Sequence, residues 1–587
     1  MDSEIDFLED EAEEFPPEVS LPMPNGFALR DYQLRCLQAI KEAWASYSRV
    51  LCVLPTGSGK TLLEAYAIKV EVDAGKKVLF IAHTEELLDQ AAEKIFRSTG
   101  LESEREKADQ HASLSASVVI ASIQTLAKDA RLMGFPDDHF SLVVIDEAHR
   151  SLAFSYQKVA CYFHFGEASL DEAWVIPEPG FPFKYKARLI GFTATADRGD
   201  RRSLGELYQS VCFEYGMIDA CKDGYLVRPI VKNIPLKIDL KGVRISRSQG
   251  GADYDKMEVA ARLAPILREL AAQIAKEALD RKVIVFLPSV DSAQRMAEAA
   301  QEAGFNASFV SGACEDRAEK ISAFRAAGAG TLMANAMLLV EGFDAPDVSC
   351  VCVLRPTKIR SLWVQCAGRG SRPLTGLIDG MATKEERCAA IAASAKPNLL
   401  LLDPLWLSDR LDLIHPIDLV ATRAEVRQKM AEAIESGATT DLLSLEATAT
   451  RDLMKSLEAA ARKHANKQAR VIDPLSWAVS LGDAALASWE PSTIWDELPA
   501  TAPQLDFIRK QHIDTTNIVH RGHAQKIIVR LLARMKLHLA PVIQLNFMRQ
   551  LGVPEEIANT LTKDEASRVI DKILEEKKSR RAATSSL

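Results

Sequence analysis

The octapeptide Leu54-Pro55-Thr56-Gly57-Ser58-Gly59-Lys60-Thr61 constrains this 587-residue chain more than any other feature. It follows an apolar run and precedes an apolar helix-like stretch, so it is expected where a buried strand turns into a helix. Backbone N–H groups at such a turn point at an anion, and the helix dipole favours negative charge there. The stretch predicts a phosphate-binding loop in which Gly57 and Gly59 let the backbone wrap closely, Lys60 contacts the outer phosphates and the Thr61 hydroxyl ligates Mg²⁺. Taken alone, the octapeptide also fits a Gly-Ser turn before an exposed lysine.

The composition is that of an ordinary globular protein of three or four domains, with 47% hydrophobic and 26% charged residues. The longest apolar runs have only the length of a strand, so we expect neither a signal peptide nor a membrane span, and we expect a cytoplasmic protein. The ten cysteines are scattered without a C-x-x-C pair, which gives no indication of a zinc or redox site.

The net charge of −9 comes from one segment. Residues 1–20 hold nine Asp and Glu, and no Lys or Arg occurs before Arg30. We interpret residues 1–26 as an acidic disordered tail, because so few apolar residues cannot offset the entropy of ordering it. From residue 21 onward acidic and basic residues balance, so the acidic pI does not argue against nucleic-acid binding on a local basic surface.

Polar residues follow a series of predicted strands. Gln33 precedes the loop and could both donate to and accept from an adenine edge. The strand 77–82 ends in His83 and Thr84, and the strand 118–122 leads into a second polar group. Because ligands bind beyond the carboxyl ends of parallel strands, these residues outline a binding edge. The second group consists of Ser122, Gln124 and Thr125.

A fourth strand, Leu142–Ile145, ends in Asp146-Glu147-Ala148-His149. A carboxylate at a strand end opposite a phosphate loop can hold Mg²⁺ together with Thr61, which suits Asp146. Glu147 is then placed to orient or deprotonate an attacking water, and His149 could reach a neighbouring motif. An acidic pair after a strand can also be a helix cap. A fifth strand, 188–192, runs into Thr193-Ala194-Thr195.

These segments together resemble the Q-motif and motifs I, Ia, II and III of superfamily 2 helicases, in the DEAD/DEAH-box group with a DEAH form of motif II. A long amphipathic helix is expected from about Lys256. A further strand series, at 283–287, 307–310 and 331–334, repeats the plan of the first half, and Asn398–Asp403 is expected to close it. Within it, Glu341–Val348 resembles motif V and Gln365–Pro373 resembles motif VI. The resemblance covers about residues 27–405.

The resemblance implies a fold and a set of site residues. We predict two tandem RecA-like parallel-sheet domains of the α/β class, at 27–225 and 226–405, followed by an all-helical C-terminal region. ATP with Mg²⁺ is expected in the cleft between the lobes, with Gly342 and Asp344 adding to the nucleotide site. Gln365, Arg369 and Arg372 are expected to act in catalysis from the second lobe. Arg369 and Arg372 would share one helical face if that segment is helical, although a solvated basic turn gives the same pattern.

The carboxyl-terminal third carries no visible chemistry. Residues 406–500 indicate a helical linker region, and 501–587 hold an internal repeat in which Gln504–Arg509 matches Gln544–Arg549. Residues 502–587 carry 15 Lys and Arg against nine Asp and Glu. This repeat could grip DNA or dock a protein partner.

The leading hypothesis is an ATP-dependent DNA helicase or translocase of the DNA-repair-like branch. DNA is favoured over RNA because the forms of motifs V and VI look more like that branch, and no membrane partner is expected. An RNA helicase and a nucleotide-gated DNA clamp that recruits a partner remain as alternatives. The resemblance implies nucleic-acid contacts or coupling through His83, Thr84, Ser122, Gln124, Thr125, His149, Thr193, Thr195, Ser311, Gly312 and Val340.

Overall fold

The computed structural model describes most of the chain from Leu29 onward. The described residues are 29–166, 186–194, 204–205, 207–234, 242–248, 251–312, 314–336, 343, 345–404, 414–421, 424–434, 439–464, 474–481, 483–489, 491 and 494–584. The acidic tail and four of the predicted site residues lie outside them, namely Thr195, Val340, Gly342 and Asp344.

The first lobe is a seven-stranded, wholly parallel sheet in the order β3-β4-β2-β5-β6-β1-β7. Its central strands are apolar apart from a few end residues because helices cover both faces, and nearly every residue in them is buried. The strands are β1 (Arg49–Val53), β2 (Val78–Ala82), β3 (Glu104–Glu106), β4 (Val118–Ser122), β5 (Leu142–Ile145), β6 (Arg188–Thr193) and β7 (Ser210–Glu214). The helical elements are α1 (Asp31–Trp44), α2 (Lys60–Asp73), α3 (Glu85–Thr99), α4 (Ile123–Leu126), α5 (Asp129–Leu132), η1 (Ala148–Leu152), α6 (Phe154–Phe165) and α8 (Met217–Lys222).

The second lobe repeats this plan in a seven-stranded sheet of order β12-β13-β11-β14-β15-β8-β16. All its pairs are parallel except that of β16 with β8. The strands are β8 (Arg228–Asn233), β11 (Lys282–Phe286), β12 (Asn306–Val310), β13 (Thr331–Asn335), β14 (Cys350–Val353), β15 (Asn398–Asp403) and β16 (Thr439–Asp441), with a separate hairpin of β9 (Ile245–Ser248) and β10 (Gly251–Tyr254). The helical elements are α9 (Lys256–Leu263), η3 (Ala264–Ile266), α10 (Leu267–Ala278), α11 (Val290–Glu302), α12 (Arg317–Ala326), α13 (Arg360–Gly368), α14 (Lys384–Ala393), η4 (Pro416–Leu419), α15 (Ala424–Ala433) and α16 (Leu442–His464).

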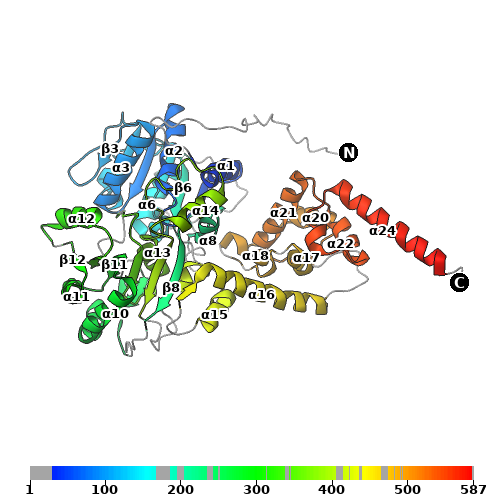
Figure 1. The fold of residues 1–587 in the computed structure, drawn as a ribbon. Coiled ribbons are helices and arrows are strands. Elements are labelled where there is room, and N and C mark those ends of the chain that lie inside the picture. The colour runs from blue at the N-terminus through cyan, green and yellow to red at the C-terminus, as the bar shows by residue number, and fades with distance from the viewer. Residues whose placement is uncertain are drawn as a thin grey trace.

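The two sheets are those of tandem RecA-like domains, as the sequence predicted (Figure 1). Two details differ from the sequence-based expectation. The long helix predicted from Lys256 is divided into α9, η3 and α10, because Pro265 cannot donate a backbone hydrogen bond in a helix interior. The stretch predicted as a helical linker also contributes strand β16, which covers the edge of β8.

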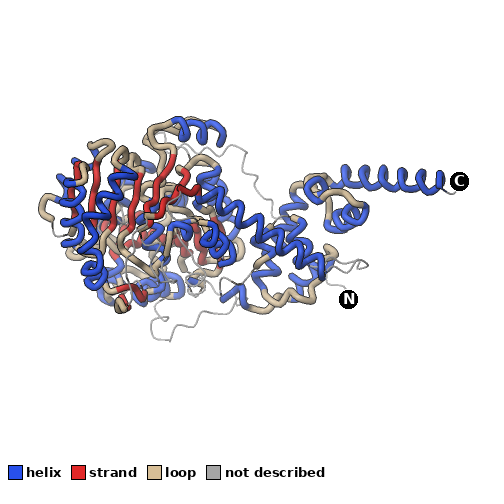
Figure 2. Tube along the Cα trace, turned by 60° about the horizontal axis from the view of Figure 1, so that its bottom comes forward, coloured by secondary structure: helices blue, strands red, loops and turns tan. Residues whose placement is uncertain are grey.

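The carboxyl-terminal part is helical and lies beside the two lobes, and α24 projects away from it (Figures 1 and 2). Its helices are α17 (Pro474–Ser480), α18 (Ala484–Ala487), α19 (Ile494–Glu497), α20 (Ala502–Lys510), α21 (Arg521–Lys536), α22 (Val542–Leu551), α23 (Glu555–Ala558) and α24 (Lys563–Thr584).

The 40-residue sequence repeat is also a structural repeat. In the first copy the Ala500 N–H donates to the Val519 carbonyl at 2.9 Å, and in the second the Ala540 N–H donates to the Leu561 carbonyl at 2.9 Å. Each copy has its own small core, built around Ile508 and Ile527 in the first and around Met548 and Ile570 in the second. The repeat is therefore a pair of helix–loop–helix modules.

A buried histidine beneath the first sheet makes the stability of lobe one depend on pH. The Nδ1 of His164 donates to the Ala187 carbonyl at 2.6 Å, so its Nε2 accepts from the Ser48 hydroxyl at 3.3 Å. Burial, with a further contribution from Arg49, lowers the pKa of His164 to about 3. The folded protein therefore holds this ring neutral at pH values where an unfolded chain protonates it.

We expect lobe one to lose stability as the pH falls below 6.5, where His164 in the unfolded chain begins to bind a proton that the folded ring does not bind. Between pH 6.5 and 5 the residue accounts for a loss of about 2 kcal/mol. The free energy of unfolding in urea should fall between these two pH values by about 2 kcal/mol less in His164→Gln than in wild type. In exposed His111→Gln it should fall as much as in wild type. An equal pH dependence in both variants would contradict the assignment.

Candidate functional site between the two lobes

The phosphate-binding loop has the backbone that the sequence predicted. It joins β1 to α2, and Gly57 and Gly59 have φ values of +88° and +76°, which favour glycine. The loop is attached to the neighbouring strand by the Leu54 N–H, which donates to the Thr193 carbonyl at 2.9 Å. Lys60 and Thr61 are the first two residues of α2, so the loop and the helix N-terminus form the anion cradle.

Helix α1 braces this loop from behind. The Gln33 amide donates to the Ser58 carbonyl at 3.2 Å and accepts from the Arg30 N–H at 2.9 Å. The Tyr32 hydroxyl also donates to the Ser58 carbonyl, and the Tyr32 ring stacks on Tyr215. Gln33 is 2% exposed, so its amide here fixes the loop, whereas the sequence interpretation gave it an adenine edge.

The acidic pair stands at the end of β5, next to the loop. Asp146 accepts from the Glu147 N–H at 2.8 Å. Glu147 has a φ of +49°, an uncommon backbone conformation for a residue with a side chain, and such strain is concentrated at functional sites. His149 lies 3.4 Å from the Glu147 carboxylate and 3.3 Å from the Thr193 hydroxyl, so it joins the acidic motif to the end of β6.

The environment sets opposite pKa shifts in the two acids. Burial, followed by the charge of Glu147, raises the pKa of Asp146 to about 6. Burial would also raise the pKa of Glu147, but the positive charges of Lys60, His149 and Arg369 outweigh it and lower that pKa. Glu147 is therefore held as a carboxylate, the state in which it can accept a proton or orient a water.

Lobe two closes directly on the phosphate-binding loop. The Ser371 hydroxyl lies 3.3 Å from the Thr56 carbonyl, and a Cβ at Gly368 would stand 2.6 Å from the Thr56 side chain. A Cβ at Gly57 would likewise stand 3.0 Å from the Arg372 side chain. The Arg372 carbonyl accepts from Lys396 at 2.6 Å, which fixes the backbone at that position. Segments more than 300 residues apart thus form one seam.

Arg369 and Arg372 lie at this seam beyond the end of a helix. Helix α13 ends at Gly368, so the two arginines do not share a helical face. Gly370 follows, and a Cβ there would collide with the Leu399 side chain, so only glycine fits at this position. Arg369 donates to the Phe343 carbonyl at 2.8 Å and lies close enough to lower the pKa of Glu147, whereas Arg372 lies over Gly57.

Two further residues belong to this site and were missed from the sequence. Glu64 is fully buried on α2, one helical turn after Lys60, and burial followed by the charge of Asp146 raises its pKa well above the usual range. An acid within the apolar run Leu62–Ile68 was the available signal. Ser371 joins the two lobes; it lies within the segment that resembles motif VI, but the sequence analysis gave it no role of its own.

The predicted nucleic-acid residues lie at the carboxyl ends of the strands, but they differ in accessibility. Gln124 is exposed, donates to the His83 carbonyl at 2.8 Å and accepts from the Ser122 hydroxyl. Thr84 caps α3, and Gly312 has open space around it. Thr125 and Ser311 are buried, and Thr125 accepts from the Ala108 N–H. Gln124, Thr84 and Gly312 are thus the more accessible members of the set.

The residues at the seam fit ATP and Mg²⁺. The loop offers a glycine cradle and Lys60 for phosphates, and Asp146 with Thr61 offers the oxygen ligands that Mg²⁺ prefers. Among the described residues around the seam, buried polar atoms without a hydrogen-bond partner include the Thr56 hydroxyl and the Gln365 amide nitrogen. Buried polar atoms of this kind need a partner, which a bound nucleotide and its water can supply.

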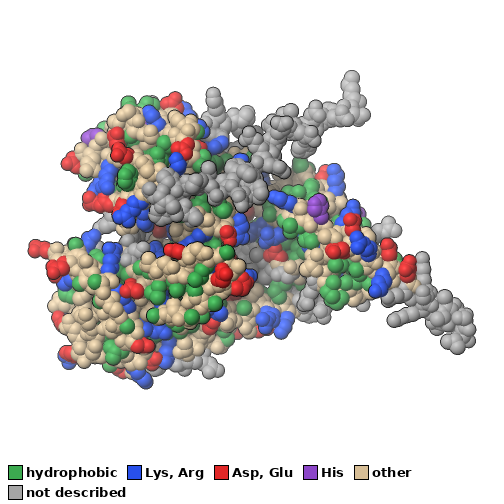
Figure 3. All heavy atoms as spheres, turned by 45° about the horizontal axis from the view of Figure 1, so that its top comes forward, with side chains coloured by type: hydrophobic (Ala, Val, Ile, Leu, Met, Phe, Trp, Pro, Cys, Tyr) green, Lys and Arg blue, Asp and Glu red, His purple; other side chains and the backbone are tan. Residues whose placement is uncertain are grey.

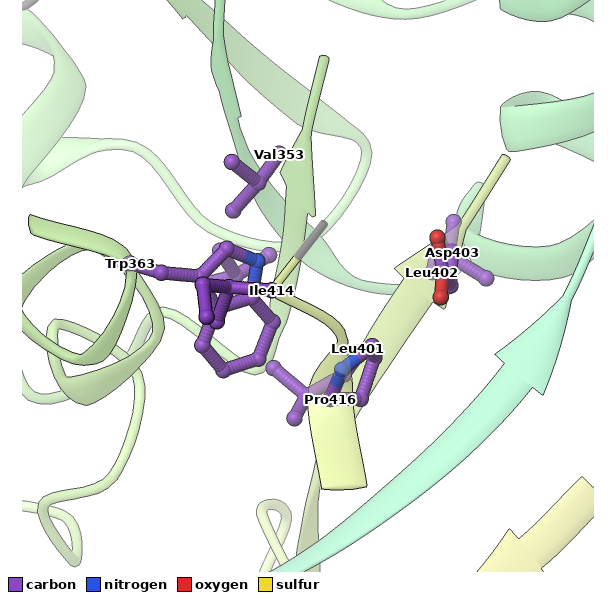
Figure 4. Close-up of a pocket in the computed structure, with 8 residues that line it drawn as sticks. Val353, Trp363, Leu401, Leu402, Asp403, Ile414 and Pro416 are labelled. Carbon is purple, nitrogen blue, oxygen red and sulfur yellow. The ribbon is translucent and has the colours of Figure 1, made fainter. Parts of the chain in front are cut away.

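A small cavity elsewhere in lobe two lacks the groups that bind ATP and Mg²⁺. It lies at the ends of β14 and β15 and is lined mainly by apolar side chains, among them Val353, Trp363, Leu401 and Ile414 (Figure 4). Its one acid, Asp403, is bonded to His415 at 2.9 Å. The cavity has no phosphate-binding group, so the seam between the lobes is the candidate site.

The fold and this seam define the class of protein. The two lobes have the fold and the motifs of superfamily 2 helicases. Residues 26–198 match the family model "Type III restriction enzyme, res subunit", and residues 263–373 match "Helicase conserved C-terminal domain". These matches confirm the assignment to superfamily 2, whereas the DEAD/DEAH-box group and the DNA-repair-like branch stay predictions.

Curated relatives agree with the class. The chain is 29% identical over 369 residues to "Putative ATP-dependent helicase IRC3" of Saccharomyces cerevisiae, covering 59% of this chain and 49% of that protein. It is 31% identical over 352 residues to "Putative mitochondrial ATP-dependent helicase irc3" of Schizosaccharomyces pombe, covering 59% and 55%. The chain thus spans about half the length of these curated relatives.

Among solved structures, the chain is similar to "ATP-dependent Type ISP restriction-modification enzyme LlaBIII bound to DNA", with a TM-score of 0.47 and 15% identity over 91% of this chain and 40% of that one. Within the part of this chain that the structure describes, no helix is long and apolar enough to cross a membrane.

Proposed function

We propose that this protein is a nucleic-acid-stimulated ATPase that uses ATP and Mg²⁺ to translocate on DNA or to unwind it. The observation that carries the proposal is the division of the catalytic groups between the lobes. Lobe one supplies the phosphate loop, Asp146 and Glu147, and lobe two supplies Arg369 and Arg372. Hydrolysis then changes how firmly the lobes hold each other, and a motor needs that difference between nucleotide states.

The residues take separate roles in this proposal. Lys60 and the loop bind the phosphates, while Asp146 and Thr61 hold Mg²⁺, which would neutralise charge on the phosphates when bound. Glu147, kept ionised by its neighbours, orients the attacking water and accepts its proton. Arg372 and Arg369 stabilise the negative charge that spreads over the transferred phosphoryl group. His149 and Thr193 link this chemistry to the neighbouring strand.

Nucleic acid would cross the carboxyl ends of the strands of both lobes. Gln124, Thr84 and Gly312 are the accessible groups for contacts to the sugar–phosphate backbone, so little base specificity is expected. DNA is favoured over RNA by the forms of motifs V and VI, and the match of residues 26–198 to a restriction-enzyme family model supports this preference.

The test is steady-state ATP hydrolysis by the full chain with no nucleic acid, with single-stranded DNA, with duplex or forked DNA, and with single-stranded RNA. The proposal expects stimulation of at least about tenfold by DNA and much less by RNA. Stimulation by RNA alone would overturn the preference for DNA. A single slow turnover with long residence on DNA would instead support a nucleotide-gated clamp.

A further inference from the structure

One stretch of the C-terminal modules contains no acidic residue and has many exposed apolar side chains. Residues 515–554 contain six Lys and Arg, three His and no Asp or Glu, although one residue in seven of the whole chain is acidic. Large apolar side chains on this surface are between 39% and 64% exposed. They are Val519, Val529, Leu532, Met535, Leu537, Ile543 and Phe547.

The apolar and basic side chains are interspersed on α21. Lys526, Val529, Leu532 and Lys536 follow each other at intervals of three or four residues and therefore lie on one helical face. Arg530, at the border of this face, pairs with Asp483 outside the stretch. Figure 3 shows apolar and basic side chains, with some acidic ones, mixed over the visible part of the C-terminal helices. We call the exposed side chains of residues 519–547 the C-terminal docking surface.

The chemistry of this surface favours a peptide over nucleic acid. Its apolar members are mostly aliphatic, and aliphatic side chains do not stack with bases as aromatic platforms do. Clusters of exposed apolar side chains mark protein interaction sites. The partner that fits is a segment with acidic residues and a few large apolar ones. Its acids would pair with the basic side chains of the surface, and its apolar residues would pack on the apolar ones.

The chain itself contains such a segment. Residues 1–20 hold nine acids and no Lys or Arg, together with Ile5, Phe7, Leu8 and Phe15. Only residues 21–28 separate the segment from Leu29, where the described chain begins, and eight residues can span up to about 28 Å. In Figure 1, α1 lies on the side of lobe one that is turned towards the C-terminal helices. A covalent tether of this length makes binding intramolecular and raises the effective concentration to the millimolar range.

We infer that residues 1–20 dock through their acidic and apolar side chains on the C-terminal docking surface of the same chain. The contact is partly electrostatic, so added salt weakens it. The inference does not depend on the proposed function, because docking can be measured without nucleotide or nucleic acid.

The first experiment measures amide hydrogen exchange of α21 and α22 in the full chain. The comparison is a full-length variant in which the nine acids of residues 1–20 are changed to Asn and Gln. Docking predicts at least threefold faster exchange in residues 521–551 of the variant, and a similar increase for wild type at 0.5 M salt. Equal exchange in the two proteins would overturn the inference.

The second experiment adds a labelled peptide of residues 1–20 to the full-length variant with the neutralised tail and follows fluorescence anisotropy. Val529→Glu with Leu532→Glu should weaken peptide binding at least tenfold. Phe96→Glu, at a similarly exposed apolar position on α3, should leave it unchanged. Equal binding to both proteins would place the contact elsewhere and overturn the inference.

Two other occupants give distinct results. If the surface joins two copies of the chain, wild type will self-associate in a concentration-dependent way that Val529→Glu with Leu532→Glu abolishes, and the peptide will not bind. If the surface instead holds nucleic acid, duplex DNA will bind to the neutralised-tail variant and the peptide will not. Val529→Glu with Leu532→Glu will then abolish DNA binding. Either result would overturn the intramolecular contact.

Discussion

Glu147→Gln is expected to leave ATP binding intact and to lower ATP turnover by about 10²-fold or more. Glutamine keeps the size of the side chain and allows the strained backbone at φ +49° to persist. It removes the carboxylate, which its lowered pKa keeps ionised and able to orient the attacking water. Binding should persist because the phosphates contact the loop and Lys60, which the substitution does not touch.

The measurement combines steady-state phosphate release with equilibrium binding of a fluorescent ATP analogue. Glu71→Gln is the matched control, because Glu71 is also a buried acid of lobe one but pairs with Lys76 away from the seam. Turnover in Glu147→Gln within about threefold of wild type would exclude Glu147 as the group that activates water. Loss of ATP binding in the same variant would instead assign it a structural role in the loop.

The sequence predicted the sheets well because their strands are short apolar runs buried on both faces. The stretch Leu142–Ile145 was predicted as a strand and is β5, and Asn398–Asp403 was predicted as the last strand of lobe two and is β15. In such runs a single physical cause, burial under helices, determines the structure. The phosphate loop was predictable for a similar reason, because its glycines have a local backbone role.

Contacts between distant parts of the chain could not be predicted in this way. The bond between Ser371 and Thr56 joins two residues 315 positions apart, and no local pattern encodes it. The sequence left open whether Arg369 and Arg372 share a helical face, and the structure answers this because α13 ends at Gly368. The orientation of the Gln33 amide likewise depends on the loop that it braces. Each of these features is set by tertiary packing.

The position of Arg372 leads to the second large prediction. Arg372→Ala is expected to lower ATP turnover by about 10³-fold, because the guanidinium over Gly57 would no longer stabilise the charge on the transferred phosphoryl group. Arg372→Lys should recover little of this loss, since an ammonium group cannot form the planar, two-pronged contact of a guanidinium. The Michaelis constant should change much less than the turnover number, because the loop and Lys60 of lobe one still bind the phosphates.

Arg295→Ala provides the control for Arg372, since Arg295 is an exposed arginine of lobe two that pairs with Asp291 away from the seam. A second variant separates chemistry from position. Lys396→Met removes the donor to the Arg372 carbonyl at 2.6 Å but keeps the guanidinium, so it should cause a smaller loss than Arg372→Ala. If Arg372→Ala raised the Michaelis constant and left the turnover number unchanged, the arginine would be a nucleotide-binding residue of the ground state. Arg369 would then be the residue that stabilises the charge of the transition state, since it lies near Glu147 and donates to the Phe343 carbonyl at 2.8 Å.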